Sequence, residues 1–488
     1  MKSNKGSKFF ENSSIYMFSS VISFVISILV LPVYTRFLSP GDFGIIVLFM
    51  MFGTMLAQFA SMNLHFSSYR YYFKYKEDLE KFITLNSSNM ITVLIIFALT
   101  GIIIYSLAEW FSSLLFNGEL TKKLIQLSFF YGCFDYLYLY LITLLTAKEK
   151  AMSFAVITIL RALLGSALSF YYIFEYSLTY MARINGLLIS QAISVLFLIY
   201  ITRTMFAFRF SCNSLKESIK LSFPLIPNQA LGMIHGSFDK VMLNLYQGTF
   251  SIGYYSFGAR FAEVLKMVID SINKVWEPFF MNLAHENNAH SKQKIVSRFY
   301  TITFILMVVG LGVIYFSEEM IKLLTTEEFY PSIYVVPVYV YFYLFAIIGS
   351  ITSPQISFSE KMIYILPSTA VSVSINVCLN LLLIPKYSAI GAAGATALAS
   401  LFSQMISYYY AMKLFPLPLS KKKLLTIYLI TIVYTIMIYP IIVFQINFLL
   451  KILLKIVLIT TFIFFGIRLN FLEVNFLDKL MRKVKFQP

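Results

Sequence analysis

Charged residues are scarce in this chain, and cysteine is scarcer still. Of 488 residues, 13% are charged and 59% are hydrophobic, and the mean hydropathy is +0.76. A soluble domain carries about 25% charged residues, so this composition excludes an ordinary soluble protein and predicts a polytopic membrane protein. The cysteines Cys133, Cys212 and Cys378 lie far apart without CxxC spacing, so neither a disulfide framework nor a metal site is indicated.

Long apolar runs make up most of the chain. Each is close to the length of about 20 residues that a helix needs to cross a bilayer, which predicts an all-α fold of about fourteen transmembrane helices. The runs cover residues 14–37, 43–65, 83–107, 122–146, 152–173, 181–202, 221–244, 252–276, 298–316, 332–357, 363–384, 391–414, 424–444 and 447–467.

Basic residues gather in the connections on one predicted side. The chain has 39 Lys and Arg against 23 Asp and Glu, a net charge of +16. Because short cytoplasmic connections are enriched in Lys and Arg, the pattern predicts that both termini are cytoplasmic and that no nucleic acid is bound. The opposite connections are predicted to be short and slightly acidic, and they include Glu318 and Glu319.

The segment 221–282 carries charges inside two apolar runs. Asp239 and Lys240 fall in the first run, and Arg260, Glu263, Lys266, Asp270 and Lys274 fall in the second. At about 100° per residue, those five side chains project within an arc of roughly 120°, which is one helical face. A charge in hydrocarbon costs about 2.5 to 3.5 kcal/mol. We therefore predict that this face meets a polar interior cavity; the plainer interpretation is mutual neutralisation along the helix.

Two further charges lie within apolar runs nearer the amino terminus. Asp135 is near the middle of run 122–146 and Arg161 near the middle of run 152–173. The connection AKEKA is tight, so the two helices are predicted to be antiparallel neighbours with both charges at similar depth. One interpretation is an ion pair that offsets both costs. The other is that Arg161 faces the cavity as an anion site, tuned by Asp135.

A short internal repeat indicates two related halves. YTRFLSPGDF from Tyr34 and YQGTFSIGYY from Tyr246 share Tyr, Ser and Gly at equal offsets. An even number of predicted spans separates them, so the halves keep the same orientation, and such proteins place the substrate between their halves. We predict two pseudo-symmetric six-helix lobes, residues 1–220 and 221–415, followed by two C-terminal helices and a cytoplasmic tail in 416–488.

Three stretches carry a resemblance to a known family. They are LPVYTRFLSPGDFG (31–44), the motifs from FPLIPNQ to WEPFF (223–280), and NLLLIPKYSAIGAAGATA (380–397). Through these motifs, and over essentially its full length, the chain resembles the bacterial polysaccharide biosynthesis flippases of the multidrug, oligosaccharidyl-lipid and polysaccharide exporter superfamily. One departure is Ser388, where the family often has glycine.

The resemblance implies a transporter, not an enzyme, without a cofactor. It implies that an undecaprenyl-diphosphate-linked oligosaccharide moves from the inner to the outer leaflet of the bacterial cytoplasmic (inner) membrane by alternating access, for O-antigen or capsule synthesis. The implied partners are that substrate, membrane lipid, and the polymerase and chain-length proteins of the same pathway. Matched residue by residue, Arg36 falls in the YTR motif, Asp239 and Lys240 in the family's acid–base pair, and Arg260 in the motif that opens helix eight.

A diphosphate needs cations in a site of low dielectric, where arginine binds oxygen atoms in bidentate fashion and lysine acts as a point charge. We predict a diphosphate and sugar site whose cations are Arg36, Arg161, Lys240, Arg260, Lys266 and Lys274, and no metal ligands. The carboxylates Asp135, Asp239, Glu263 and Asp270 either position these cations or bind a coupling proton or cation.

Three alternatives are weighed against this hypothesis. A multidrug or small-cation antiporter of the same superfamily is expected to have an acidic cavity, and the mixed charges at 260–274 argue against it. The related flippase for the peptidoglycan precursor fits the YTRFLSP motif less well. A membrane glycosyltransferase or polymerase is expected to show a catalytic constellation on a long loop, and all predicted connections are short.

Overall fold

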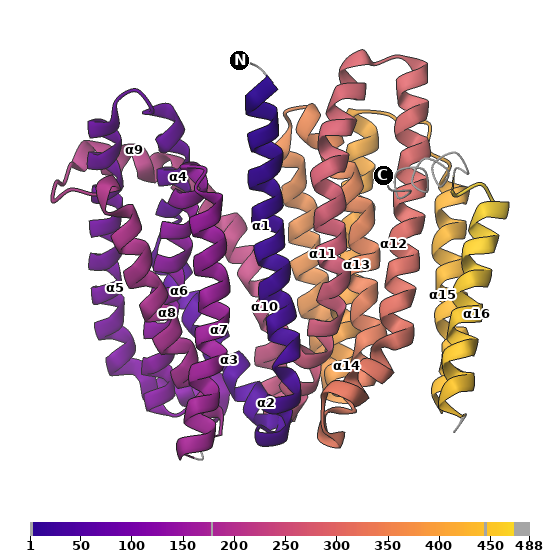
Figure 1. Ribbon diagram of the computed structural model, residues 1–488, viewed down its shortest axis with the longest axis horizontal. Coiled ribbons are helices and arrows are strands. Elements are labelled where there is room, and N and C mark those ends of the chain that lie inside the picture. Colours follow the sequence, from indigo (N-terminus) through magenta and orange to yellow (C-terminus); the bar gives the residue numbers. More distant parts are fainter. Residues whose placement is uncertain (1–2, 177–178, 444–446, 473–488) are drawn as a thin grey trace, which may run out of the picture. The chain divides into compact units, whose positions relative to one another are not determined.

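The described part of the chain is built from helices alone. The computed structural model describes residues 3–176, 179–443 and 447–472, and every regular element in those ranges is a helix (Figure 1). Contacts divide the chain into two compact units. Unit 1 comprises Met1–Gly253 with Leu324–Glu328, and unit 2 comprises Tyr254–Leu323 with Phe329–Pro488.

Unit 1 holds the first ten α-helices and the start of the eleventh. They are α1 (Ser3–Leu29), α2 (Leu31–Phe37), α3 (Pro40–Ala60), α4 (Leu64–Lys74), α5 (Leu79–Phe116), α6 (Lys122–Ala147), α7 (Ala151–Tyr176), α8 (Tyr180–Thr202), the 3-10 turn η1 (Arg203–Met205), α9 (Cys212–Ser222), η2 (Phe223–Leu225) and α10 (Ile226–Gln247). Within the unit, α7 packs against α1 and α8, and α6 packs against α3 and α8.

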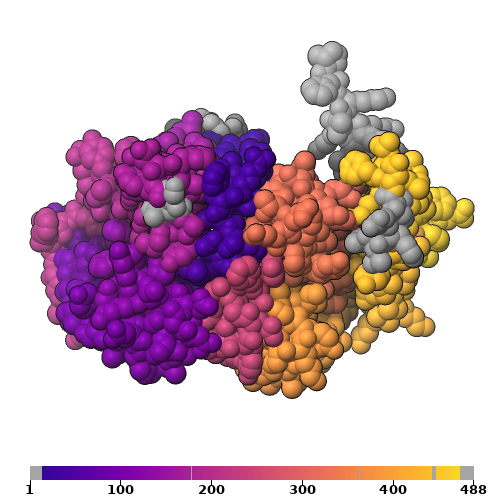
Figure 2. Space-filling model, turned by 90° about the horizontal axis from the view of Figure 1, so that it is seen from below, coloured from indigo at the N-terminus to yellow at the C-terminus, as the bar shows by residue number. Residues whose placement is uncertain are grey.

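Unit 2 holds the remaining helices. They are α11 (Thr249–Glu286), α12 (Ala289–Leu324), η3 (Glu327–Phe329), α13 (Ser332–Phe358), η4 (Met362–Ile365), α14 (Leu366–Leu414), α15 (Lys421–Val443) and α16 (Phe448–Arg468). α13 and α14 form its most extensive helix pair. Figure 2 shows α15 and α16, in yellow, at one edge of this unit beside its coral and orange helices.

The predicted fold class is confirmed. Eleven helices in the described ranges are long and apolar enough to cross a bilayer. α14 runs through two predicted spans, 363–384 and 391–414, and is counted once among the eleven. α10 and α11 coincide with two more predicted spans but are more polar, so they fall outside that set. These two more polar helices are the ones that carry the charges of segment 221–282.

Several predicted boundaries are wrong. The charged connection expected between residues 276 and 298 is helical except at Asn287 and Asn288. Glu318 and Glu319 were expected in a loop, but α12 continues to Leu324, because both carboxylates find buried partners. The short amphipathic helices α4 and α9 were not predicted; they pack on each other and on α5. The connection near Gln445 lies outside the described residues.

The proline–glycine motif after α2 is a helix start. The Ser39 side chain accepts a hydrogen bond from the backbone N–H of Asp42 at 3.1 Å, and the Asp42 carboxylate accepts one from the Ser39 N–H at 2.9 Å. This reciprocal capping box, with Pro40 in the first turn, satisfies amide groups that would otherwise lack partners. The SPGD sequence of the repeat therefore caps the start of α3.

The starts of α3 and α11 touch through backbone atoms. A side chain at Gly44 would collide with the Thr249 carbonyl group, and one at Gly253 would collide with the Pro40 carbonyl group. The two repeated turns, near Tyr34 and Tyr246 in the sequence, thus meet within unit 1. Only glycine allows so close an approach.

The division by contacts differs from the predicted lobe boundary. α10 packs on α3 and α5, so contacts assign residues up to Gly253 to unit 1. The internal repeat instead puts the boundary between residues 220 and 221. Because contacts and repeats are different criteria, the lobes 1–220 and 221–415 with the tail 416–488 stay a prediction.

A buried ion cluster joins α12 to α16 in unit 2. Lys455 Nζ lies 2.5 and 2.7 Å from the Glu319 carboxylate oxygens, and Lys451 Nζ lies 2.6 Å from Glu318 Oε1. Lys322 also reaches Glu318, at 2.8 Å. Lys455 is fully buried, so its ion pair with Glu319 holds α16 against α12.

Ser388 bends α14 between its two spans. Its backbone has φ 50° and ψ −130°, a conformation that glycine adopts far more readily than serine. A non-glycine residue held this way costs on the order of 1–3 kcal/mol. Ser388 is also the position at which the sequence departs from the pattern of the family that it resembles, and α14 bends there with serine in place.

Candidate functional site

Asp135 and Arg161 meet in unit 1, as their antiparallel helices predicted. Arg161 Nη1 on α7 lies 3.8 Å from Asp135 Oδ1 on α6, and Gln191 on α8 donates a hydrogen bond to the same oxygen at 3.0 Å. Both charged side chains remain about one third exposed, 34% for Arg161 and 30% for Asp135. Three helices therefore converge on one partly open charged site.

The Arg161 guanidinium keeps hydrogen-bond donors available. It lies over the Tyr138 ring, 4.1 Å from the centroid, and the Tyr138 hydroxyl is fixed by Thr158 at 3.2 Å. Among the described residues it makes an ion pair but donates no hydrogen bond, because 3.8 Å is too long for one. The ion pair and the anion site, the two interpretations of this residue, are thus compatible in one geometry.

A second arginine, Arg183, was missed by the sequence analysis. Its Nη1 donates to the Tyr34 hydroxyl at 2.8 Å, and to Gly165 O and Ser169 Oγ at 3.3 Å each. The guanidinium also lies over the Tyr34 ring, 4.8 Å from its centroid. The available signal was a charge inside the predicted run 181–202; its partner, the tyrosine of the YTR motif, is too distant in sequence to infer.

The charged face of α11 has the predicted arrangement. Arg260, Lys266, Asp270 and Lys274 are exposed and Glu263 is half-buried. On the other side of the helix, Phe257, Leu265 and Ile269 are buried in unit 2. The charges therefore point away from the apolar core of their own unit.

The remaining predicted residues have diverse settings. Asp239 is buried on α10, and Lys240 Nζ contacts its carboxylate at 3.4 Å and the Gly236 carbonyl oxygen at 2.5 Å. Arg36 is exposed in the last turn of α2. The structure thus brings together Asp135 with Arg161 and Asp239 with Lys240. Whether any of these residues binds a substrate stays a prediction.

Solved structures show which fold the chain has. "Lipid II flippase MurJ, inward closed conformation" superposes with a TM-score of 0.74 at 18% identity, over 94% of this chain and 99% of that chain. An inward-facing multidrug resistance MATE family transporter of the MOP superfamily superposes with a TM-score of 0.60 at 13% identity, over 80% and 94%. At these identities the likeness concerns the fold: the chain has the helical fold of the MOP-superfamily transporters.

Sequence comparison then specifies the family. The profile described as "Polysaccharide biosynthesis protein" matches residues 9–284, more than half of the chain. The chain belongs to the polysaccharide biosynthesis protein family, which confirms the family prediction. It is also 26% identical over 199 residues to the capsular polysaccharide biosynthesis protein CapF of Staphylococcus aureus, a match over 41% of this chain and 50% of that relative.

Proposed function

We propose that this membrane protein translocates an undecaprenyl-diphosphate-linked oligosaccharide from the inner to the outer leaflet of the bacterial cytoplasmic membrane. Family membership supports a role in polysaccharide synthesis, and the fold is one that a lipid II flippase uses. The capsular relative supports capsule as the product. Both termini are then cytoplasmic, and the polymerase and chain-length proteins of the pathway are the natural partners.

The observation that carries the proposal is the setting of Arg161. The Arg161 guanidinium lies within a predicted membrane span, is partly exposed and has N–H donors that are not used in hydrogen bonds within the described ranges. Such a group suits a diphosphate, because arginine binds phosphate oxygens in bidentate fashion. Its ion pair with Asp135 lowers the cost of keeping the charge there while no substrate is bound. Tyr138 adds a ring against which the guanidinium is held flat.

The exposed charges of α11 form the second part of the proposed route. Arg260, Lys266 and Lys274 supply positive charge, and Glu263 and Asp270 lie among them on the same helical face. Five charges on a lipid-facing helix would cost more than its apolar residues return, so this face belongs to a polar compartment. Mixed charge also favours a diphosphate over an organic cation, which is the expected substrate of the antiporter alternative.

Loss of the protein tests the proposal against a synthase. In a strain that makes a surface polysaccharide with this protein, deletion is expected to leave complete lipid-linked repeat units on the cytoplasmic leaflet. Lipid extraction with sugar analysis detects them, and restoring the protein is expected to clear them. Repeat units that lack sugars or their lipid carrier would instead identify a biosynthetic enzyme.

The glycine contact between α3 and α11 gives a test of alternating access. Gly44→Ala and Gly253→Ala each force a methyl group into a backbone carbonyl group. Overpacking of this kind costs about 1–3 kcal/mol, which shifts a two-state equilibrium by about 5–150-fold. We expect the population in which the contact is open to rise by that factor. The measurement is the rate of maleimide labelling of a cysteine placed at the buried Leu38, in a background without native cysteines, and this rate should increase.

Gly312→Ala is the matched control for these two substitutions. It adds the same methyl group inside α12, where nothing lies within 4 Å, so labelling and export should both stay at the unsubstituted level. Equal labelling in all three variants would show that the contact does not take part in a conformational equilibrium.

A further inference from the structure

A continuous groove follows the seam between α5 and α6 in unit 1. One cavity of about 510 Å³ lies between residues 94–106 of α5 and 126–137 of α6. A second, of about 390 Å³, lies between residues 87–94 of α5, residues 137–141 of α6 and the segment 203–208. Leu94 and Leu137 line both cavities, so the two join end to end.

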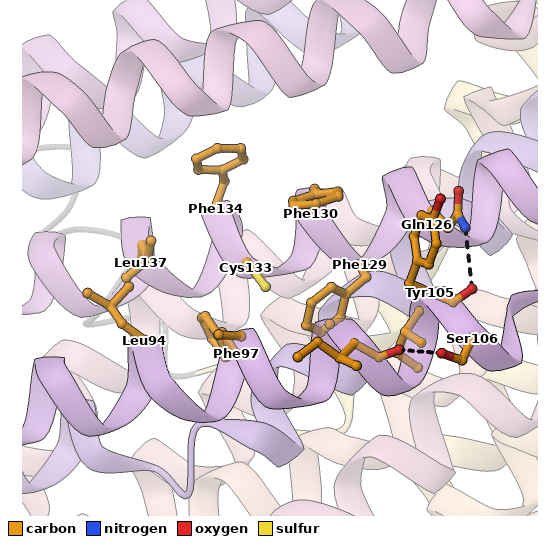
Figure 3. Close-up of a pocket in the computed structure, with 14 residues that line it drawn as sticks. Leu94, Phe97, Tyr105, Ser106, Gln126, Phe129, Phe130, Cys133, Phe134 and Leu137 are labelled. Carbon is orange, nitrogen blue, oxygen red and sulfur yellow. Dashed lines mark hydrogen bonds between the residues drawn. The ribbon is translucent and has the colours of Figure 1, made fainter.

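The walls of the groove are apolar for most of its length. Figure 3 shows Leu94 and Phe97 on α5 and Phe129 and Cys133 on α6 lining the space between the helices. Phe97 and Phe129 are buried and form its base. Ala98 belongs to the same lining and is small and exposed, so the groove stays open above it.

The ends of the groove are polar and its length matches a bilayer. From Ser87 to Ser106 the groove follows α5 for about 28 Å at 1.5 Å per residue, close to the hydrocarbon thickness of about 30 Å. Tyr105, Ser106 and Gln126 close one end, where Gln126 reaches the Tyr105 carbonyl at 3.5 Å. Arg203 is the one charged residue that lines either of these two cavities, and it stands at the opposite end.

The arginine end is held in a fixed shape. The Asn86 side chain donates to the Met205 carbonyl at 2.9 Å, and the Ala207 N–H donates to Ser87 Oγ at 2.8 Å. These bonds tie the segment after α8 to the start of α5. Arg203 itself is exposed and lies over the Tyr200 ring, 4.7 Å from its centroid. A cation is therefore positioned at the mouth before any ligand arrives.

We infer that this groove binds one chain of an anionic phospholipid, with the headgroup phosphate on Arg203. The axes of two packed helices such as α5 and α6 are about 8–10 Å apart. A third helix with its side chains is about 10–12 Å wide, so it is too broad to enter the groove between them. An extended hydrocarbon chain is narrow enough to fit. The cavity volumes lie in the range of small-molecule sites, about 300–1,000 Å³. The single cation at one end favours a headgroup of net negative charge, because phosphatidylcholine carries an ammonium group beside the same phosphate. This assignment is independent of the proposed transport function.

Native mass spectrometry of the full chain tests the inference. The protein is released from nanodiscs of equal parts phosphatidylglycerol and phosphatidylcholine, and retained lipid is counted. Unsubstituted protein is expected to retain one phosphatidylglycerol. Arg203→Gln should lower its retention about tenfold, as expected for loss of a hydrogen bond to a charged group, and Arg203→Lys should keep most of it. Ala98→Trp, which fills the groove, should also release the lipid.

Two matched variants separate the groove from the rest of the surface. Leu99→Trp places the same indole side chain on α5 outside the groove, and Arg209→Gln removes an arginine that faces Glu80 at 3.8 Å outside the groove; both should retain the lipid. Equal retention in Arg203→Gln or Ala98→Trp would overturn the inference. So would equal retention of phosphatidylcholine, or a dimer that Ala98→Trp dissociates.

Discussion

Arg161→Ala is expected to abolish polysaccharide export while the protein remains in the membrane at normal levels. Removing the cation that binds the diphosphate in the proposed complex costs about 2–5 kcal/mol, so substrate affinity should fall at least about thirtyfold. Arg161→Lys keeps a point charge but not the bidentate geometry, and it should retain partial export. Export is measured as surface polysaccharide per cell, with membrane protein quantified in parallel.

Arg260→Ala is expected to abolish export as well, because it removes a positive charge from the charged face of α11.

A double substitution distinguishes substrate binding from a structural ion pair. Arg161→Ala leaves the Asp135 carboxylate without the cation 3.8 Å away. If the pair only stabilised the fold, Asp135→Asn would relieve that defect and restore export in the double variant. We expect the double variant to have normal thermal stability and still to export nothing. Export restored in the double variant would reduce Arg161 to a structural residue.

Lys455→Met is expected to destabilise the protein by about 3–5 kcal/mol, because it leaves the largely buried Glu319 carboxylate, 18% exposed, beside an apolar side chain. The lysine is fully buried and makes contacts of 2.5 and 2.7 Å to that carboxylate. Thermal unfolding of the purified protein in detergent measures the loss. The expected site of the damage is the junction between α12 and α16.

Removing the second charge should reverse most of this loss. In the double variant with Glu319→Gln, no unpaired charge remains at that position, and replacing a buried ion pair by uncharged side chains is often close to neutral. The cluster keeps Glu318 with Lys451 at 2.6 Å. If the single and double variants unfolded at the same temperature, the side chain of Lys455 would contribute by packing and not by charge.

Sequence patterns with a local cause were predicted well. Spans follow from the length of apolar runs, and the face of α11 follows from the helical period, so Phe257 is buried and Arg260 exposed as expected. The proximity of Asp135 and Arg161 also followed, because a tight turn joins two helices of equal length. In each case the deciding interaction spans few residues or a single connection.

Interactions between distant segments could not be predicted. Arg183 donates a hydrogen bond to Tyr34, which is 149 positions away in the sequence. Lys455 forms an ion pair with Glu319, which is 136 positions away. A lone sequence gives the cost of such charges in a membrane but not the partner that offsets it. The extent of α12 was underestimated for the same reason: its glutamates looked like loop residues because their lysines lie far along the chain.

Reconstitution tests the central claim most directly. Purified protein is placed in liposomes with an undecaprenyl-diphosphate-linked oligosaccharide, and the fraction exposed to an added glycosidase that cannot cross the bilayer is followed over time. With unsubstituted protein, we expect the glycosidase-accessible fraction of the lipid-linked oligosaccharide to rise from the share in the outer leaflet towards the whole amount. With Arg161→Ala, the accessible fraction should stay at the share in the outer leaflet. Equal accessibility in protein-free liposomes, or no rise with the unsubstituted protein, would contradict the proposal that this chain moves lipid-linked oligosaccharide across the membrane.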